Sequence, residues 1–224
     1  MEKFFTNAFN NLSEEGKENF YKTIFMNDDS EYAAQLRVDY YRSKFKSMGE
    51  NVRIGKGVNI INPQYISVGN DVQISDGCTL IARGELGITL GDNVRLQHRV
   101  YLDTERSTEG YINIGRGCYI GTGTSPFGHR GLEIGTDCLF AQNITLTPYS
   151  HIFDDPDRII YSQGGHCEKV TIGNDVYLGM GCCVMYSGNI GEGSVIGAHS
   201  TVVKPIPPYS VAVGTPAKVI KKRD

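Results

Sequence analysis

Residues 172–201 read IGNDVYLGMGCCVMYSGNIGEGSVIGAHST, and this stretch counts in sixes. An aliphatic residue opens each six, at Ile172, Leu178, Val184, Ile190 and Ile196. A period of six is neither the alternation of a single strand nor the 3.6-residue period of a helix. A fixed short period is typical of a repeat protein whose units stack on one another. The stretch therefore predicts a triangular coil of three short strands, in which each six forms one side.

The same pattern extends outward from this stretch as far as residue 52. An aliphatic residue followed by glycine marks the coils, at Ile54-Gly55, Val68-Gly69, Leu90-Gly91, Ile114-Gly115, Ile134-Gly135, Ile172-Gly173 and Ile190-Gly191. From Val68 onward the intervals are 22, 24, 20, 38 and 18 residues. The shortest interval equals three sixes, so the longer intervals predict residues that are extruded at corners. The longest interval predicts an extruded loop near residues 152–168.

The fifth position of each six indicates what most of the cysteines do. It holds Val58, Val72, Cys78, Val94, Val100, Cys118, Cys138, Ile144, Val176, Cys182, Ser194 and Ser200. These small or β-branched residues suit an inward column, where a free cysteine behaves as a small hydrophobe. A metal site needs closely paired ligands, and no C-x-x-C motif occurs in the chain. We therefore expect no metal and no disulfide from these four cysteines, and we assign no role to Cys167 or Cys183.

Residues 1–50 differ from the rest and predict a separate N-terminal helical segment, followed by a β-helix domain over residues 51–224. Ser13 is a good N-cap for a first helix. Asp28 stands three residues before Glu31, a capping-box spacing for a second helix. Gly49 is the expected C-terminal cap of that helix.

Composition excludes several classes of protein. The chain has 224 residues with 22 Lys and Arg against 25 Asp and Glu, a formal net charge of −3. No basic excess matches a nucleic-acid backbone, and no run of 18 apolar residues predicts a membrane span. The N-terminal MEKFFTNAFN lacks the continuous apolar stretch of a secretion signal. We expect a cytoplasmic protein without nucleic-acid partners.

The hexapeptide pattern and the segment VTIGNDVYLGMGCCVMYSGNIGEGSVIGAHSTVVKPIPPYSVAVGTPAKVIKKR, residues 170–223, resemble the left-handed parallel β-helix acyltransferases. Residues 134–222 are most similar to the maltose and galactoside O-acetyltransferases and to the O-acetyltransferases of surface-polysaccharide synthesis. The resemblance implies a mainly β, left-handed coil. It also implies acetyl-CoA as co-substrate and a homotrimer whose subunits share active sites.

His151 is the candidate catalytic residue. It falls at a corner, where the extra residues leave the coil, and the family's catalytic histidine occurs at the matching place. Acetyl transfer from a thioester to a hydroxyl needs a general base, and imidazole, with a reference pKa of about 6.5, accepts a proton near neutral pH. One ring nitrogen needs an acceptor that selects the tautomer. Asp155 and a backbone carbonyl are the alternatives for that acceptor.

The remaining site residues follow from the resemblance and from the predicted corners. Gly179, Gly197 and Ala198 match family positions near the thiol arm of coenzyme A, and Lys218 matches a basic position near its phosphates. No G-x-x-x-x-G-K-[ST] phosphate loop occurs. Polar and aromatic side chains beside the loop are candidates for holding the acceptor: Asp103, His129, Asn143 and Tyr149, with Phe127 and Phe153 against a sugar ring.

The leading hypothesis is an O-acetyltransferase acting on a hydroxyl of a sugar or glycan precursor. Three alternatives stay open. They are an N-acetyltransferase acting on an amino sugar nucleotide, an antibiotic-inactivating acetyltransferase, and a β-helix scaffold without catalysis. The long interruption at His151 disfavours the scaffold.

Overall fold

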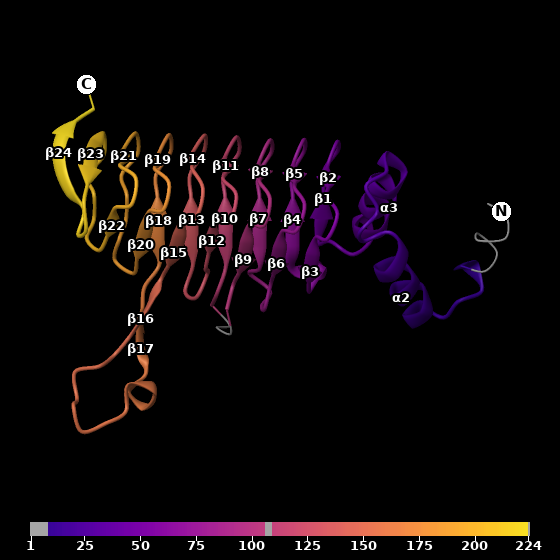
Figure 1. Cartoon of the computed structure of the whole chain (residues 1–224), viewed down its shortest axis with the longest axis horizontal. Coiled ribbons are helices and arrows are strands. Elements are labelled where there is room, and N and C mark those ends of the chain that lie inside the picture. The colour runs from indigo at the N-terminus through magenta and orange to yellow at the C-terminus, as the bar shows by residue number, and fades with distance from the viewer. Residues whose placement is uncertain (1–8, 106–108, 224) are drawn as a thin grey trace.

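The computed structural model describes residues 9–105 and 109–223, and its strands stack on three faces of a prism (Figure 1). In the described residues, sheet A consists of β1 (Ser47–Met48), β4 (Ile66–Val68), β7 (Ile88–Leu90), β10 (Ile112–Ile114), β13 (Leu132–Ile134) and β18 (Val170–Ile172). Sheet B consists of β2 (Arg53–Ile54), β5 (Gln73–Ile74), β8 (Arg95–Leu96), β11 (Tyr119–Ile120), β14 (Leu139–Phe140), β19 (Tyr177–Leu178), β21 (Val195–Ile196), β23 (Ser210–Val213) and β24 (Lys218–Lys222).

The third face has two parts. Sheet C consists of β3 (Asn59–Ile61), β6 (Thr79–Ile81) and β9 (Tyr101–Asp103). Sheet D consists of β12 (Ser125–Pro126), β15 (Thr145–Thr147), β20 (Cys183–Met185) and β22 (Thr201–Val202). A parallel bridge between Asp103 and Phe127 joins the two parts. A short 3-10 helix, η1 (Pro63–Tyr65), follows the first strand of sheet C.

Each residue of a coil lies against the matching residue of the next coil. Ile112 pairs with Leu132, and Leu132 pairs with Val170, in parallel register. The last of these steps spans the 38-residue interval without a shift, because the extra residues leave the coil at one corner. The chain is therefore a left-handed parallel β-helix, which confirms the fold expected from the repeat and the resemblance.

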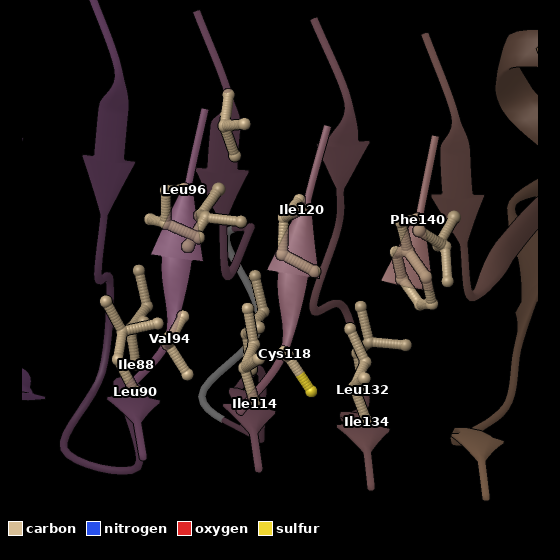
Figure 2. Packing of buried hydrophobic residues seen from close by; sticks show 14 of the residues in the cluster. Ile88, Leu90, Val94, Leu96, Ile114, Cys118, Ile120, Leu132, Ile134 and Phe140 are labelled. Carbon is tan, nitrogen blue, oxygen red and sulfur yellow. The ribbon is translucent and has the colours of Figure 1, made fainter. Parts of the chain in front are cut away.

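The core is built of columns of equivalent residues. Figure 2 shows Leu96, Ile120 and Phe140 on successive coils, each fully buried inside the prism. The predicted fifth-position column is buried throughout. Cys118 and Cys138 belong to it, and their thiols donate hydrogen bonds to the carbonyls of Gly135 and Gly173. The four cysteines of this column are thus core residues, as expected.

Two helices, α2 (Glu14–Ile24) and α3 (Glu31–Arg42), precede the prism. The Ser13 hydroxyl accepts a hydrogen bond from the N–H of Gly16, which confirms the first cap. The second helix is capped by Ser30, whose hydroxyl accepts from the N–H of Ala33. Asp28 instead accepts from the N–H of Ser30, so its prediction as the cap was wrong by two residues.

Gly49 is not the helix terminator that its position suggested. Helix α3 ends at Arg42, and β1 at Ser47–Met48 already pairs with β4, so the solenoid begins before residue 51. A Cβ on Gly49 would overlap the backbone of Gly69 and Asn70 in the next coil. Gly49 is therefore needed because two coils approach closely here, and not because it ends a helix.

The helices cover the open end of the prism. Arg37 is buried and donates hydrogen bonds to the carbonyl of Ile54 in the first coil and to those of Phe25 and Asp28. Tyr21 and Tyr40 stack with ring centroids 3.8 Å apart. An uncovered strand end would expose unpaired backbone groups, and α3 satisfies one of them here. None of the described helices is long and apolar enough to cross a bilayer. The first eight residues, on which the expected lack of a secretion signal mostly rested, lie outside the described residues.

Candidate active site

A hairpin arm leaves the prism where the repeat is interrupted (Figure 1). Its strands are β16 (Tyr149–His151) and β17 (Gly165–Cys167), which pair in antiparallel register, and η2 (Ile160–Gln163) lies near its tip. We call residues 149–167 the arm. The Gln163 side chain holds the tip by hydrogen bonds to the backbone of Asp155 and Arg158. The predicted loop is therefore an ordered hairpin that projects from the coil.

His151 lies on the stem of the arm and is exposed. Its Nδ1 lies 3.4 Å from the hydroxyl of Tyr149, at a distance suited to a hydrogen bond. The two rings meet edge to face, with centroids 5.0 Å apart and planes at 89°. Because the two nitrogens lie on different sides of an imidazole ring, Nε2 is directed away from the Tyr149 hydroxyl on this exposed side chain.

His129 covers one face of the Tyr149 ring. The two rings are stacked, with centroids 5.0 Å apart and planes at 12°. Burial lowers the pKa of His129, and this effect outweighs the negative charges of Glu105 and Asp103, which raise it. His129 Nδ1 is buried and has no hydrogen-bond partner among the described residues. Tyr149 thus contacts both imidazoles, with its hydroxyl beside His151 and one ring face against His129, so that this face is not open to a sugar ring.

Asp103 lies two coils before the arm and is 2% exposed. Its carboxylate accepts hydrogen bonds from Arg83 Nε at 2.9 Å, Arg83 Nη2 at 3.0 Å, the Tyr101 hydroxyl at 3.1 Å and the N–H of Glu105 at 2.8 Å. Burial alone would raise the pKa of Asp103, but these hydrogen bonds outweigh it and lower the pKa. A carboxylate has about four acceptor positions, so all are in use. In this arrangement Asp103 holds Arg83 and Tyr101 and has no acceptor position left for a sugar hydroxyl.

Asp155 is not placed to orient His151. Its Oδ1 accepts a hydrogen bond from the N–H of Asp157, within a turn near the tip of the arm. Tyr149 occupies the Nδ1 side of His151 instead. Asp155 is close to His151 in sequence, but its carboxylate takes part in a turn of the arm, and no hydrogen bond joins it to His151 among the described residues.

Asn143 lies at a different corner from the arm, between β14 of sheet B and β15 of sheet D, and is exposed. A Cβ on Gly123 would approach its amide oxygen, so Asn143 packs against the coil before it. The structure therefore separates Asn143 from His129, Tyr149 and His151. Phe127 lies beside His129, with ring centroids 6.2 Å apart, whereas Phe153 is on the arm and is 68% exposed.

The four residues expected to bind coenzyme A lie together at the corner that follows sheet B. A Cβ on Gly179 would overlap the backbone of Ala198 in the next coil, and one on Gly197 would overlap Val213. Val213 in turn pairs with Lys218 across the β23–β24 hairpin. Lys218 is exposed at the C-terminal end of this column. We call this column, which comprises Gly179, Gly197, Ala198 and Lys218, the glycine corner.

Backbone donors are available along the same edge of the prism. Among the described residues, four successive coils each carry one corner N–H that forms no hydrogen bond, at Thr122, Gln142, Met180 and Ala198. Adjacent strands are about 4.8 Å apart, so these donors form a regular row. An extended ligand with amide and phosphate oxygens can therefore hydrogen-bond along this edge.

Sheet D separates the glycine corner from the arm within one chain. Six residues of nearly extended chain connect Asn143 to Tyr149, a span of about 20 Å at a rise of about 3.3 Å per residue. Its outward face carries small side chains in register, at Ser125, Thr145, Cys183 and Thr201. Two grooves lie elsewhere on the molecule, and His151 borders neither. One, of about 720 Å³, lies at the corner of Gly173 and Gly191, and the other, of about 600 Å³, lies beside Tyr40.

Two features of this site were not predicted from the sequence. Arg83 has no motif around it, and only its place one coil before Asp103 would have suggested the pair. Gly165 lies directly across the arm from His151, and nothing in the sequence distinguishes it from other loop glycines. Within the described residues no group of three or more His, Cys, Asp or Glu side chains is arranged to hold a metal ion.

Several known proteins resemble this chain, although no family model matches it. It is 30% identical to a dTDP-4-amino-4,6-dideoxy-D-glucose acyltransferase of Escherichia coli, over 80% of this chain and 83% of the relative. It is 34% identical to the galactoside O-acetyltransferase of Escherichia coli strain K12, over 62% of this chain and 65% of the relative. In three strongly matching relatives, this chain covers 54%, 65% and 43% of the relative's length, which is about half.

A solved structure has the same fold. It is AntD, an N-acyltransferase from Bacillus cereus, in complex with dTDP and 3-hydroxybutyryl-CoA. The match has a TM-score of 0.59 and 24% identity, and it covers 89% of this chain and 92% of AntD. At this level of identity the likeness concerns the fold.

Proposed function

The chain belongs to the hexapeptide-repeat acyltransferases, and on that premise we propose that it transfers an acetyl group from acetyl-CoA to a hydroxyl of a sugar or glycan precursor. The position of His151 carries the proposal. An exposed imidazole lies on an arm that leaves a rigid coil, and one of its nitrogens is within hydrogen-bond distance of the Tyr149 hydroxyl. A base held in this way on a rigid scaffold suits proton transfer.

His151 acts as the general base in the proposed reaction. Its Nε2 accepts the hydroxyl proton as the acceptor oxygen attacks the thioester carbonyl carbon, which forms a tetrahedral intermediate. The carbon–sulfur bond then breaks, and the thiolate of coenzyme A receives the proton from Nε2. One proton moves twice, and the products are the acetyl ester and free coenzyme A.

The glycine corner is the proposed donor site. Gly179 and Gly197 let successive coils approach closely, Ala198 is small and exposed, and the corner N–H groups of Met180 and Ala198 form no hydrogen bond among the described residues. The pantetheine arm carries amide oxygens that accept such hydrogen bonds. Lys218 stands at the end of this column and suits the phosphates of the nucleotide.

We propose that the enzyme is a homotrimer in which His151 of one subunit faces a donor bound at the glycine corner of the next. Asn143 lies on the same edge of the prism as the glycine corner, and its separation of about 20 Å from Tyr149 within one chain supports the arrangement. The exposed apolar residues of the arm support it as well, since Phe153, Ile159, Ile160 and Tyr161 are each more than half exposed in the isolated chain.

A second acceptor class has a specific observation in its favour. The amino-sugar acyltransferase relative is spanned over 83% of its length, against 65% for the galactoside O-acetyltransferase. An amine on a nucleotide-linked sugar is therefore the alternative to a hydroxyl. The scaffold, the donor and the base are the same for both acceptors, because each reaction removes one proton from the attacking atom.

A parallel acceptor screen tests the proposal. Neutral sugars, glycan repeat units and amino-sugar nucleotides are each incubated with acetyl-CoA, release of the free thiol is followed, and products are analysed by mass spectrometry and NMR. Acetyl esters support the hydroxyl proposal, whereas amides alone would replace it with the amine alternative. No thiol release beyond background on any acceptor would remove the enzymatic proposal altogether.

Subunit mixing tests the shared site. A His151→Ala subunit and an Ala198→Trp subunit are each expected to be inactive as homotrimers, because one lacks the base and the other places an exposed bulky ring in the donor site. After unfolding and refolding together, mixed trimers would regain activity if the two sites come from different subunits. Sedimentation confirms the trimer, and an active monomer or absence of complementation would contradict the proposal.

A further inference from the structure

We infer that Tyr149 is the positioning residue of His151 and that its hydroxyl oxygen selects the imidazole tautomer, an inference that rests on the proposed role of His151 as base. The contact is direct, because the Tyr149 hydroxyl lies 3.4 Å from Nδ1 of His151. The edge-to-face arrangement of the rings, at 89° with centroids 5.0 Å apart, restricts rotation of the imidazole.

The direction of this hydrogen bond follows from the proposed chemistry. If Nδ1 carries the proton and donates to the Tyr149 oxygen, Nε2 keeps its lone pair and is the base. If Tyr149 donated to Nδ1, the proton of neutral His151 would be on Nε2, and the accessible nitrogen would be unable to accept another. A base at Nε2 therefore requires Tyr149 to be the acceptor.

Tyr149 is itself held in place from two further directions. His129 stacks on one face of its ring, with planes at 12° and centroids 5.0 Å apart. Gly165 lies directly across the arm from His151, and a Cβ at Gly165 would overlap the ring and the hydroxyl of Tyr149. The phenol therefore lies against bare backbone, in space that only glycine leaves open.

No carboxylate takes over this function in the described part of the chain. Among residues 9–105 and 109–223, Tyr149 alone forms a side-chain hydrogen bond with His151, and the Asp155 carboxylate accepts from the N–H of Asp157. A phenol oxygen is neutral, so it orients the imidazole without adding a charge beside the reacting centre. This arrangement replaces the acidic partner that often orients a catalytic histidine.

The direct test measures the tautomer of His151 by NMR in protein with ¹⁵N-labelled histidine, with His151→Ala used to assign the signal. We expect the Nδ1–H form in the unaltered protein and a shift toward the Nε2–H form in Tyr149→Phe, which keeps the ring and loses the oxygen. Tyr161→Phe is the matched control, because Tyr161 is on the same arm and is 88% exposed. An Nε2–H form in the unaltered protein, or the same tautomer in Tyr149→Phe, would overturn the inference.

Activity supplies a second readout. Tyr149→Phe should lower kcat by about 2- to 12-fold, the range expected for one neutral hydrogen bond, while KM for the acceptor stays unchanged. Gly165→Ala should reproduce both the tautomer shift and the loss of kcat, because its methyl group displaces the phenol while Tyr149 is still present. Tyr149→Phe acting on KM alone would indicate a substrate contact and contradict the positioning role.

The two levels of the proposal fail differently. If His151→Ala keeps full activity, the assigned base is wrong, whatever the tautomer. If His151→Ala is inactive but Tyr149→Phe changes neither tautomer nor kcat, the base stands and the positioning role of Tyr149 falls. The NMR measurement needs no acceptor, so it remains decisive even before the substrate is identified.

Discussion

The coils and the arm follow opposite rules within the same chain. In the coils, every six residues return a side chain to the same buried column, and Leu96, Ile120 and Phe140 are fully buried on successive coils. In the arm, side chains such as Tyr161 are exposed, and order comes from local hydrogen bonds of Gln163. The comparison separates stability from the proposed chemistry: the coils contain the buried core, and the arm carries the proposed base, His151, as an exposed side chain.

The largest expected effect removes chemistry from the arm and leaves the coils intact. His151→Ala should lower turnover by about 10²- to 10⁴-fold, the usual contribution of a general base, with almost no change in melting temperature, because the side chain is exposed. Turnover with the acceptor found in the screen and a thermal melt are the measurements. Near-normal turnover of the purified variant would show that the arm does not carry the base.

A substitution in the buried core of the coils should instead lower the free energy of unfolding. Phe140→Ala should destabilise the protein by about 3–5 kcal/mol, because it deletes a fully buried ring from a packed column. Leu139→Ala is the matched control: Leu139 precedes Phe140 on the same strand but is 48% exposed, so little stability should be lost. Chemical denaturation measures both variants, and equal losses would mean that the inward and outward positions are not distinct.

The unfolding free energy should depend on pH through His129, a coil residue that stacks on Tyr149 of the arm. Burial lowers the pKa of His129 in the folded state, so the unfolded chain binds more protons at mildly acidic pH. The stability that neutral His129 contributes is therefore present above about pH 6.5 and lost as the pH falls through its folded-state pKa. His129→Phe should flatten this fall in the unfolding free energy between about pH 7 and 5. The exposed His98, changed to Phe, is the control, and a slope unaltered in His129→Phe would argue against this assignment.

The smallest expected effect concerns Asp155. Asp155→Asn keeps a side-chain oxygen that accepts from the N–H of Asp157, so activity should change by less than about twofold. A steady-state measurement beside His151→Ala makes the contrast. A loss as large as that of His151→Ala would mean that the arm rearranges on substrate binding and brings Asp155 to the imidazole.

Much of the site could be predicted because the repeat ties position in the chain to position in space. Gly179 and Gly197 occupy the second position of sixes that are one coil apart, Ala198 follows Gly197, and the three are neighbours at the glycine corner. The same count identified the interruption that became the arm. For Asn143 and Asp155, the six-residue count did not predict where the side chain lies. A corner residue can face any of three edges, and a residue in an extruded loop has no repeat to place it.

The periodicity of the sequence alone determined the parallel coils and the buried columns, because one face of each short strand must be apolar and a six-residue period returns it to the same face. It also determined the location of the arm, since extra residues can leave a stacked coil only at a corner. Only the tertiary structure decided what surrounds His151. Its neighbours Tyr149, His129 and Gly165 come together through antiparallel pairing in the arm and stacking between coils, and both are contacts between residues whose spacing follows no period.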